Sequence, residues 1–343
     1  MRFGILLSFQ GPAAFGQTAE SAYAAAVEQA VAAEALGFSS AWVTEHHFND
    51  DGYLPAPLIA CAAIAARTTR LRVGPAVLLL PLVNPVRLAE ELAVLDVLSR
   101  GRLDVGVGMG YRDAEFLGTG IPTAQRKARF EEGLEILRRA WAGDPFDYDG
   151  RCYTLRGVRV RPRPVQQPHP PLWFGAKSQA GLRRAAGYGA AFLLPMTPPL
   201  SAVSEQAADY RGALDAAGHD GAKATIALMR EVWVADSPDA AWAEIGDAFR
   251  YTYTETYGPQ HIPYDDNGRR IDRPDDPFLM SARFRADRMI YGDPDTVVND
   301  IRRFVAATGA SELICRFALP GLPPEWVLAS MRRFAAEVMP RVD

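Results

Sequence analysis

Apolar positions follow two different patterns that alternate along the chain. Short, almost continuous apolar runs are typical of strands buried on both faces, and longer stretches with apolar residues every three or four positions are typical of the helices that cover them. The short runs predict strands at residues 3–8, 39–43, 71–80, 103–107, 172–175, 190–194, 225–234 and 313–317. The periodic stretches predict helices at residues 20–36, 57–68, 85–98, 125–141, 178–186, 201–217, 238–251, 295–307 and 324–338.

Strands that alternate with helices form parallel βαβ units. Eight such units in 343 residues predict an α/β fold, a single (β/α)8 TIM barrel that spans residues 1–343 as one domain. Two stretches interrupt the repeat as insertions, residues 144–170 before strand five and residues 257–288 around helix seven. An open, doubly wound sheet is the alternative, but no Gly-x-Gly-x-x-Gly pattern follows the first strand.

Composition narrows the classes of function. The net charge is -4 and no block of five basic residues occurs, which argues against nucleic-acid binding. The cysteines Cys61, Cys152 and Cys315 lie far apart without zinc-type spacing, so we expect neither a metal site nor a disulfide framework. No apolar run reaches the ~18 residues that span a membrane, and no signal-peptide pattern begins the chain. We therefore expect a cytoplasmic protein without membrane contact.

Titratable residues gather where the second predicted strand ends. Glu45, His46 and His47 follow closely after residues 39–43. Because the C-terminal ends of parallel barrel strands share one face, these side chains are expected at the face that carries the chemistry. Imidazole changes its charge near neutral pH, so the two histidines are candidates for proton transfer. The structural alternative is a capped strand end with surface histidines.

Several segments, taken in order, carry a family resemblance. They are residues 44–48 (Thr-Glu-His-His-Phe), 73–81, 84–87, 95–102, 108–116, 307–310, 330–331 and 338–340. Together they resemble the bacterial luciferase-like family of flavin-dependent monooxygenases, and Glu-His-His-Phe is closer to the luciferase α chain than to the deazaflavin-dependent branch. The resemblance implies an FMN-dependent monooxygenase of the two-component type. Such an enzyme takes reduced FMN from a separate flavin reductase and uses O2 to oxidise an apolar organic substrate, for example an aldehyde or a secondary metabolite.

The resemblance also implies roles for residues of the reactive face. His46 matches the family's active-site histidine, a general acid or base, and Glu45 and His47 would orient it or pack beside it. The bond between Ala76 and Val77 matches a non-prolyl cis peptide behind the flavin ring, with an ordinary trans strand as the alternative.

The flavin phosphate is expected at a helix start. Met109 stands where the family has an arginine after strand four, so another residue must supply the positive charge. Backbone N–H groups at the start of the predicted helix 178–186 favour phosphate, and Lys177 and Ser178 add a charge and a hydroxyl there. Ser178 also fits a plain N-cap, and Arg112 is a second candidate for the charge. The expected cofactor-binding residues are Ala76, Val77, Met109, Gly110, Arg112, Gly175, Ala176, Lys177 and Ser178.

Two other functions remain open on the same barrel. One is hydride transfer by an oxidoreductase that uses a deazaflavin cofactor, and the other is a non-catalytic flavin-binding or partner subunit like the luciferase β chain. The presence of His46 argues against the second. By the same resemblance we expect a homodimer, because residues 57–68 and 85–98 carry Ala and Leu on more than one side, as helices covered by another subunit do.

Overall fold

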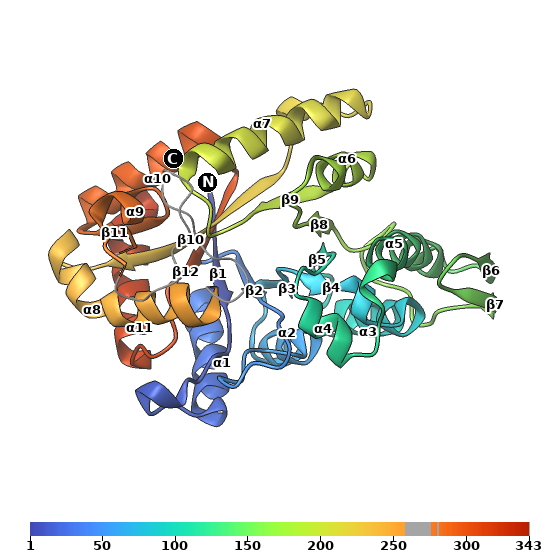
Figure 1. Ribbon diagram of the computed structural model, residues 1–343, viewed down its shortest axis with the longest axis horizontal. Helices are drawn as coiled ribbons and strands as arrows, with labels where there is room; N and C mark the ends of the chain where they lie inside the picture. The colour runs from blue at the N-terminus through green and yellow to red at the C-terminus, as the bar shows by residue number, and fades with distance from the viewer. Residues whose placement is uncertain (258–275, 280, 343) are drawn as a thin grey trace.

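Parallel strands form a nearly closed barrel with helices outside it in the computed structural model, which describes residues 1–257, 276–279 and 281–342 (Figure 1). Hydrogen-bonded neighbours follow the order β3-β2-β1-β12-β10-β9-β8-β5-β4. A bridge between Val73 and Leu103 joins β3 to the segment before β5 and brings the two edges of the sheet together. The barrel strands are β1 (Arg2–Leu7), β2 (Ser40–Val43), β3 (Arg72–Pro75), β4 (Leu78–Leu79), β5 (Val105–Gly108), β8 (Leu172–Phe174), β9 (Ala191–Leu194), β10 (Ile226–Val234) and β12 (Glu312–Arg316).

The helices cover the outer side of the strands (Figure 1). Helices that are neighbours around the barrel pack on one another, α1 on α2, α2 on α3, α3 on α5, α6 on α7 and α7 on α10. They are α1 (Ala19–Ala35), α2 (Pro57–Arg67), α3 (Pro85–Ser99), α4 (Asp113–Gly118), α5 (Arg126–Ala142), α6 (Gln179–Gly187), α7 (Leu200–Ala216), α8 (Pro238–Tyr251), α9 (Ala282–Ala286), α10 (Pro294–Thr308) and α11 (Pro324–Arg333). Single π-helical turns, Thr252–Thr256 and Phe334–Val338, follow α8 and α11. Short 3-10 turns lie at Ala13–Phe15, Leu80–Leu82, Thr123–Gln125, Gly221–Lys223 and Met339–Arg341.

Local sequence determines where the helices begin. Thr18, Asn84, Ser178, Ser237 and Asp293 are N-caps whose side chains accept a backbone N–H of the first turn of α1, α3, α6, α8 and α10. The nine predicted helices match observed ones within one residue at each end, except that the last predicted helix ends as a π-helical turn.

The third predicted strand is interrupted. Residues 71–80 divide into β3 and β4, and the peptide bond between Ala76 and Val77 is cis, as the family resemblance implies. The prediction of one continuous strand is therefore wrong. Hydrophobicity could not reveal the break, because the flanking residues on both sides of it are buried.

Both predicted insertions contain regular structure that the sequence did not predict. Residues 144–170 hold an antiparallel hairpin of β6 (Phe146–Asp149) and β7 (Thr154–Val158). Within residues 257–288, residues 258–275 and 280 lie outside the described residues, and the described remainder includes α9. Strand β11 (Met289–Gly292) follows and pairs in parallel with β10.

Side chains along most of the barrel strands alternate between two apolar clusters. On β1, for example, Ile5 and Leu7 belong to the large cluster that includes the helices, whereas Leu6 belongs to a smaller cluster. Because neighbouring residues of a strand point to opposite faces, the smaller cluster fills the barrel interior. Its buried members are Leu6, Trp42, Trp173, Leu193, Met196, Ala227 and Ile314.

Candidate active site

A cavity of about 380 Å³ opens at the C-terminal ends of the barrel strands, the face at which the sequence predicts the chemistry. The walls are mainly apolar and come from most of the barrel strands and the loops that follow them. The expected site residues that line it are Glu45, His46, Ala76, Val77, Met109, Gly110, Gly175, Ala176, Lys177 and Ser178. Two expected residues, His47 and Arg112, do not line it.

The backbone of Ala76 and Val77, backed by two glycines, forms what we call the cavity floor. A Cβ built on Gly108 would lie 2.3 Å from Cγ2 of Val77, and one built on Gly175 would lie 2.9 Å from its Cγ1. Since real Cβ contacts are longer than this, both positions require glycine for Val77 to keep its place. The floor therefore offers a surface on which a planar ring can lie close to the backbone.

His46 stands on one wall of the cavity at the centre of a hydrogen-bonded chain. Its Nδ1 lies 2.8 Å from Oε1 of Glu115, and its Nε2 lies 3.2 Å from the hydroxyl of Tyr111. The ring of Tyr53 packs edge-on against the imidazole with centroids 4.9 Å apart. Burial lowers the pKa of His46, against the opposing effect of Glu115, and so favours the neutral imidazole.

Glu45 and His47 form a separate pair behind His46. Nε2 of His47 lies 2.9 Å from Oε1 of Glu45, whose Oε2 accepts the backbone N–H of Leu79 at 2.9 Å. Burial raises the pKa of Glu45, and the hydrogen bond that the His47 imidazole donates to Glu45 raises the pKa of His47. His47 lines an apolar groove formed by α2 and α3, so it faces away from the cavity, and Glu45 touches both spaces.

The start of α6 forms another wall of the cavity. Ser178 is the N-cap, and its Oγ accepts the backbone N–H of Gly181 at 3.2 Å. Burial lowers the pKa of Lys177 to about 8, and its Nζ lies 5.4 Å from the centre of the Tyr111 ring. Arg184, one of the lining residues that the sequence did not suggest, is held by an ion pair with Glu131 at 2.6 Å.

Arg112 is turned away from the cavity and buried. Its guanidinium donates to Oδ1 of Asn49 at 2.9 Å and to the carbonyl of Thr256 at 3.2 Å, and it lies 3.8 Å from Glu115. These neutral acceptors and one carboxylate tie it to the protein interior. The expectation that Arg112 could replace the family's phosphate arginine therefore has no support from its position.

Glu115 and Arg316 also belong to the site and have no role in the sequence-based expectations. Glu115 is buried in α4 and reaches His46, although 69 positions separate the two. Arg316, at the end of β12, is buried in the cavity wall and donates to the hydroxyl of Tyr257 at 2.7 Å. The one sequence signal for Arg316 is a charged residue inside the otherwise apolar run 313–317.

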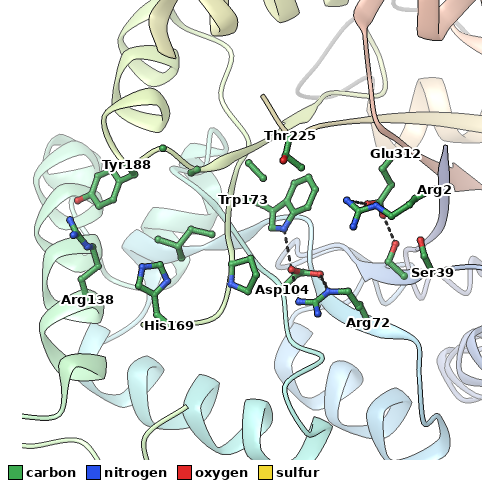
Figure 2. Close-up of a pocket in the computed structure, with 16 residues that line it drawn as sticks. Arg2, Ser39, Arg72, Asp104, Arg138, His169, Trp173, Tyr188, Thr225 and Glu312 are labelled. Carbon is green, nitrogen blue, oxygen red and sulfur yellow. Dashed lines mark hydrogen bonds and ion pairs between the residues drawn. The ribbon is translucent and has the colours of Figure 1, made fainter. Parts of the chain in front are cut away.

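A second cavity, of about 520 Å³, lies at the N-terminal ends of the strands (Figure 2). Asp104 accepts Nε of Arg72 at 2.6 Å and the indole N–H of Trp173 at 3.2 Å, and Arg2 pairs with Glu312 at 3.1 Å. Each buried carboxylate here is neutralised by an arginine. Polar groups at this end of a barrel serve stability, so we place the chemistry in the first cavity.

Among the residues that the structure describes, no cluster of His, Cys, Asp or Glu is arranged to hold a metal ion. Within the same residues, no helix is both long enough and apolar enough to cross a membrane.

Comparison with known proteins identifies the family. A model of the luciferase-like monooxygenases matches residues 1–312. The alkanal monooxygenase alpha chain of Photorhabdus luminescens is 26% identical, covering 99% of this chain and 96% of that protein. The oxygenase component of a flavin-dependent trigonelline monooxygenase from Acinetobacter baylyi is 28% identical over 66% of this chain and 63% of that protein.

Solved structures share the fold over nearly the full length. The monooxygenase RslO1 of Streptomyces bottropensis superposes with a TM-score of 0.84 and 30% identity, covering 99% of both chains. The oxygenating constituent of 3,6-diketocamphane monooxygenase from Pseudomonas putida, solved with FMN, has a TM-score of 0.80 and 22% identity over 100% of this chain and 99% of that one. A coenzyme F420-dependent reductase from Methanopyrus kandleri has a TM-score of 0.77 and 19% identity with the same coverage. The family match over most of the chain decides the assignment, and this protein belongs to the luciferase-like monooxygenase family.

Proposed function

We propose that this chain, as one barrel domain, is the oxygenase of a two-component system that uses reduced FMN from a separate reductase and O2 to oxidise an apolar organic substrate. The observation that carries the proposal is that a single cavity joins the cavity floor, the start of α6 and His46. A flavin needs a flat surface for its ring and a cationic site for its phosphate, and an oxygenase needs a group that moves protons.

The residues present fit FMN. The cavity floor is backbone that carries only the small side chains of Ala76 and Val77, and the missing Cβ atoms of Gly108 and Gly175 let Val77 keep its place. At the start of α6, Lys177 supplies a positive charge, and the helix start favours an anion. We assign the ring to the floor and the phosphate to Lys177 and Ser178.

Bound reduced FMN supplies the electrons and the site at which O2 reacts. The chain supplies the surroundings. Apolar walls limit the access of water to the cavity, and Nε2 of His46 accepts the hydroxyl of Tyr111 at the edge of that space. Glu45 and His47 fix the loop that carries His46, since Glu45 binds the backbone of Leu79 beside the floor.

The names of the relatives support this proposal. An oxygenase component implies a partner that delivers reduced flavin, and the trigonelline enzyme is such a component. The main alternative is hydride transfer with a deazaflavin, since F420-dependent enzymes share this barrel. The third possibility is a non-catalytic partner subunit. The hydrogen bonds that link Glu115, His46 and Tyr111 argue against it, because such a subunit needs no group that moves protons.

We extend the proposal to a homodimer. The groove along α2 and α3 has a volume of about 570 Å³, and Ile59 and Leu98 are exposed there by 74% and 63%. Large apolar side chains gathered on two neighbouring helices are typical of a surface that another subunit covers. A second copy related by a twofold axis would present the same two helices to this groove.

The test is stopped-flow mixing of O2 with the protein and either reduced FMN or a reduced deazaflavin. The proposal expects FMN to bind and to be reoxidised in the presence of the protein with an added slow phase that protein-free FMN lacks. It also expects no tight binding of the deazaflavin. Reoxidation at the rate of protein-free FMN, together with tight binding of the deazaflavin, would support hydride transfer instead.

A further inference from the structure

We infer that Tyr111 is a second catalytic residue, whose hydroxyl takes a proton from the bound substrate while it passes its own proton to His46. The inference rests on the proposed function for the identity of the cavity as the active site. It assigns the cavity a substrate with an acidic O–H, an enol or a phenol, because the hydrogen bonds lead from the cavity through the Tyr111 hydroxyl to the basic nitrogen of His46.

The geometry places three side chains in line. Glu115 from α4 lies 2.8 Å from Nδ1 of His46, and Nε2 of His46 lies 3.2 Å from the hydroxyl of Tyr111. Tyr111 follows β5 and lines the cavity, whereas Glu115 is buried behind His46. The order from the protein interior to the cavity is therefore carboxylate, imidazole, phenol.

The surroundings of Glu115 fix the direction of the hydrogen bonds. Its Oε1 also accepts the backbone N–H of His47 at 3.1 Å and lies 3.8 Å from the guanidinium of Arg112. This oxygen is an acceptor, so Nδ1 of His46 carries the proton and donates it. A neutral imidazole then has a bare Nε2, and Tyr111 must donate to it.

The charge state of His46 agrees with this direction. Burial lowers its pKa, and the groups that face it are Glu115 and Arg112 on and before α4, His47 in its own loop, and the rings of Tyr53 and Tyr111. The single lone pair of Nε2 is already directed at the hydroxyl of Tyr111. A substrate therefore reaches this base through Tyr111.

The step transfers two protons, one from the substrate to Tyr111 and one from Tyr111 to His46, and no electrons. The O–H bond of the substrate breaks and a new O–H bond forms on Tyr111, while the former O–H bond of Tyr111 breaks and an N–H bond forms on Nε2 of His46. The imidazolium that results lies against Glu115 and is stabilised there. Burial raises the pKa of Tyr111, so the coupled transfer avoids a separate phenolate in the cavity.

Two measurements on the flavin-free full chain test this, with 4-nitrophenol as the probe. Nitrogen-15 NMR of labelled histidines should show His46 protonated on Nδ1 and neutral at pH 7. The pKa of His46 should fall in Glu115→Gln, which weakens the bond to Nδ1, and rise in Tyr111→Phe, which removes a donor that favours the neutral form. Opposite shifts are not expected of residues that only support the fold.

Absorbance of the bound probe gives the second measurement. The pH midpoint at which bound 4-nitrophenol ionises should be lower in the native chain than in Tyr111→Phe, and Tyr148→Phe, in the distant β6–β7 hairpin, should match the native chain. Equal midpoints in the native chain and Tyr111→Phe, or an Nε2-protonated His46, would overturn the relay. Failure of the native chain to bind the probe would overturn the substrate class. Neither measurement uses flavin, so each stands apart from the outcome with reduced FMN.

Discussion

Replacing Lys177 by alanine should weaken FMN binding, because its ammonium is the charge that we assign to the phosphate. Burial lowers its pKa to about 8, which means that part of its hydration is already lost before a ligand arrives. The charge-assisted contact then forms with little further desolvation. One such contact is worth roughly 1.5–3 kcal/mol, so the dissociation constant should rise about tenfold to about 150-fold.

The pH dependence of FMN binding is a second test of the role of Lys177. Phosphate binds the protonated lysine, so FMN affinity of the native protein should be highest below pH 8 and should fall as the pH rises through about 8. With that pKa, ~90% of Lys177 would be neutral at pH 9 and ~10% at pH 7 before ligand is added. A phosphate monoester has its second pKa near ~6, so its own charge hardly changes in this range. In Lys177→Ala the affinity should be flat between pH 7 and pH 9.

Quenching of FMN fluorescence on titration with protein measures the affinity, and riboflavin, which lacks the phosphate, is the matched ligand. Riboflavin affinity should be nearly the same in Lys177→Ala and in the native protein. Lys223→Ala, which removes an exposed lysine at the surface, should behave as the native protein with both ligands. The reasoning is refuted if Lys177→Ala loses riboflavin as strongly as FMN, or if FMN affinity does not change. Unchanged FMN affinity would indicate that Arg184, which also lines the cavity, binds the phosphate instead of Lys177.

Three further changes test other parts of the site. His46→Ala should lower turnover by ~10²–10⁴-fold and leave flavin binding near normal. His219→Ala, which removes an exposed histidine, should change neither turnover nor flavin binding. If His46→Ala turns over at the native rate, His46 and His47 have a structural role only. Leu98→Glu should halve the particle mass in light scattering, and a native protein that already has the mass of one chain would contradict the dimer. Gly108→Ala should lower the free energy of unfolding by about 1–3 kcal/mol and weaken flavin binding, because its Cβ would lie 2.3 Å from a methyl group of Val77. Gly212→Ala, in α7 with no atom within 4 Å of the added Cβ, is the matched control and should not destabilise.

The regular elements of the barrel could be predicted from local sequence, because their signals are local. Ser237 and Pro238 mark the start of α8, and the predicted range 238–251 coincides with it. Such signals depend on neighbours within one or two turns. The break between β3 and β4 has no local apolar signal, and the cis bond at Ala76–Val77 was expected from the family resemblance alone.

The site could be predicted in part. Strand order alone brings His46, Lys177 and Met109 to one cavity, since parallel strands share one carboxyl face. Side-chain direction is set by tertiary partners that the sequence does not display. Arg112 follows a strand end as expected, yet Asn49 and Thr256 turn it inward.

Glu115 is the opposite case, a residue that belongs to the site although the sequence did not suggest it. It lies in α4, which has six residues, and so short a helix carries too little periodicity to be predicted. Its contact with His46 joins segments 69 positions apart. No spacing rule covers such a pair, and only the closed barrel brings it together.

The cavity floor has a consequence for how this scaffold can change its choice of substrate. Two glycines and a backbone segment present few side chains to exchange, so mutation can hardly remodel the floor without displacing Val77. The walls are different, because Met109, Met196 and Met229 all line the cavity. Unbranched thioether side chains repack readily around new shapes. Natural variation and directed evolution should therefore alter substrate range through these three methionines while the floor is inherited unchanged.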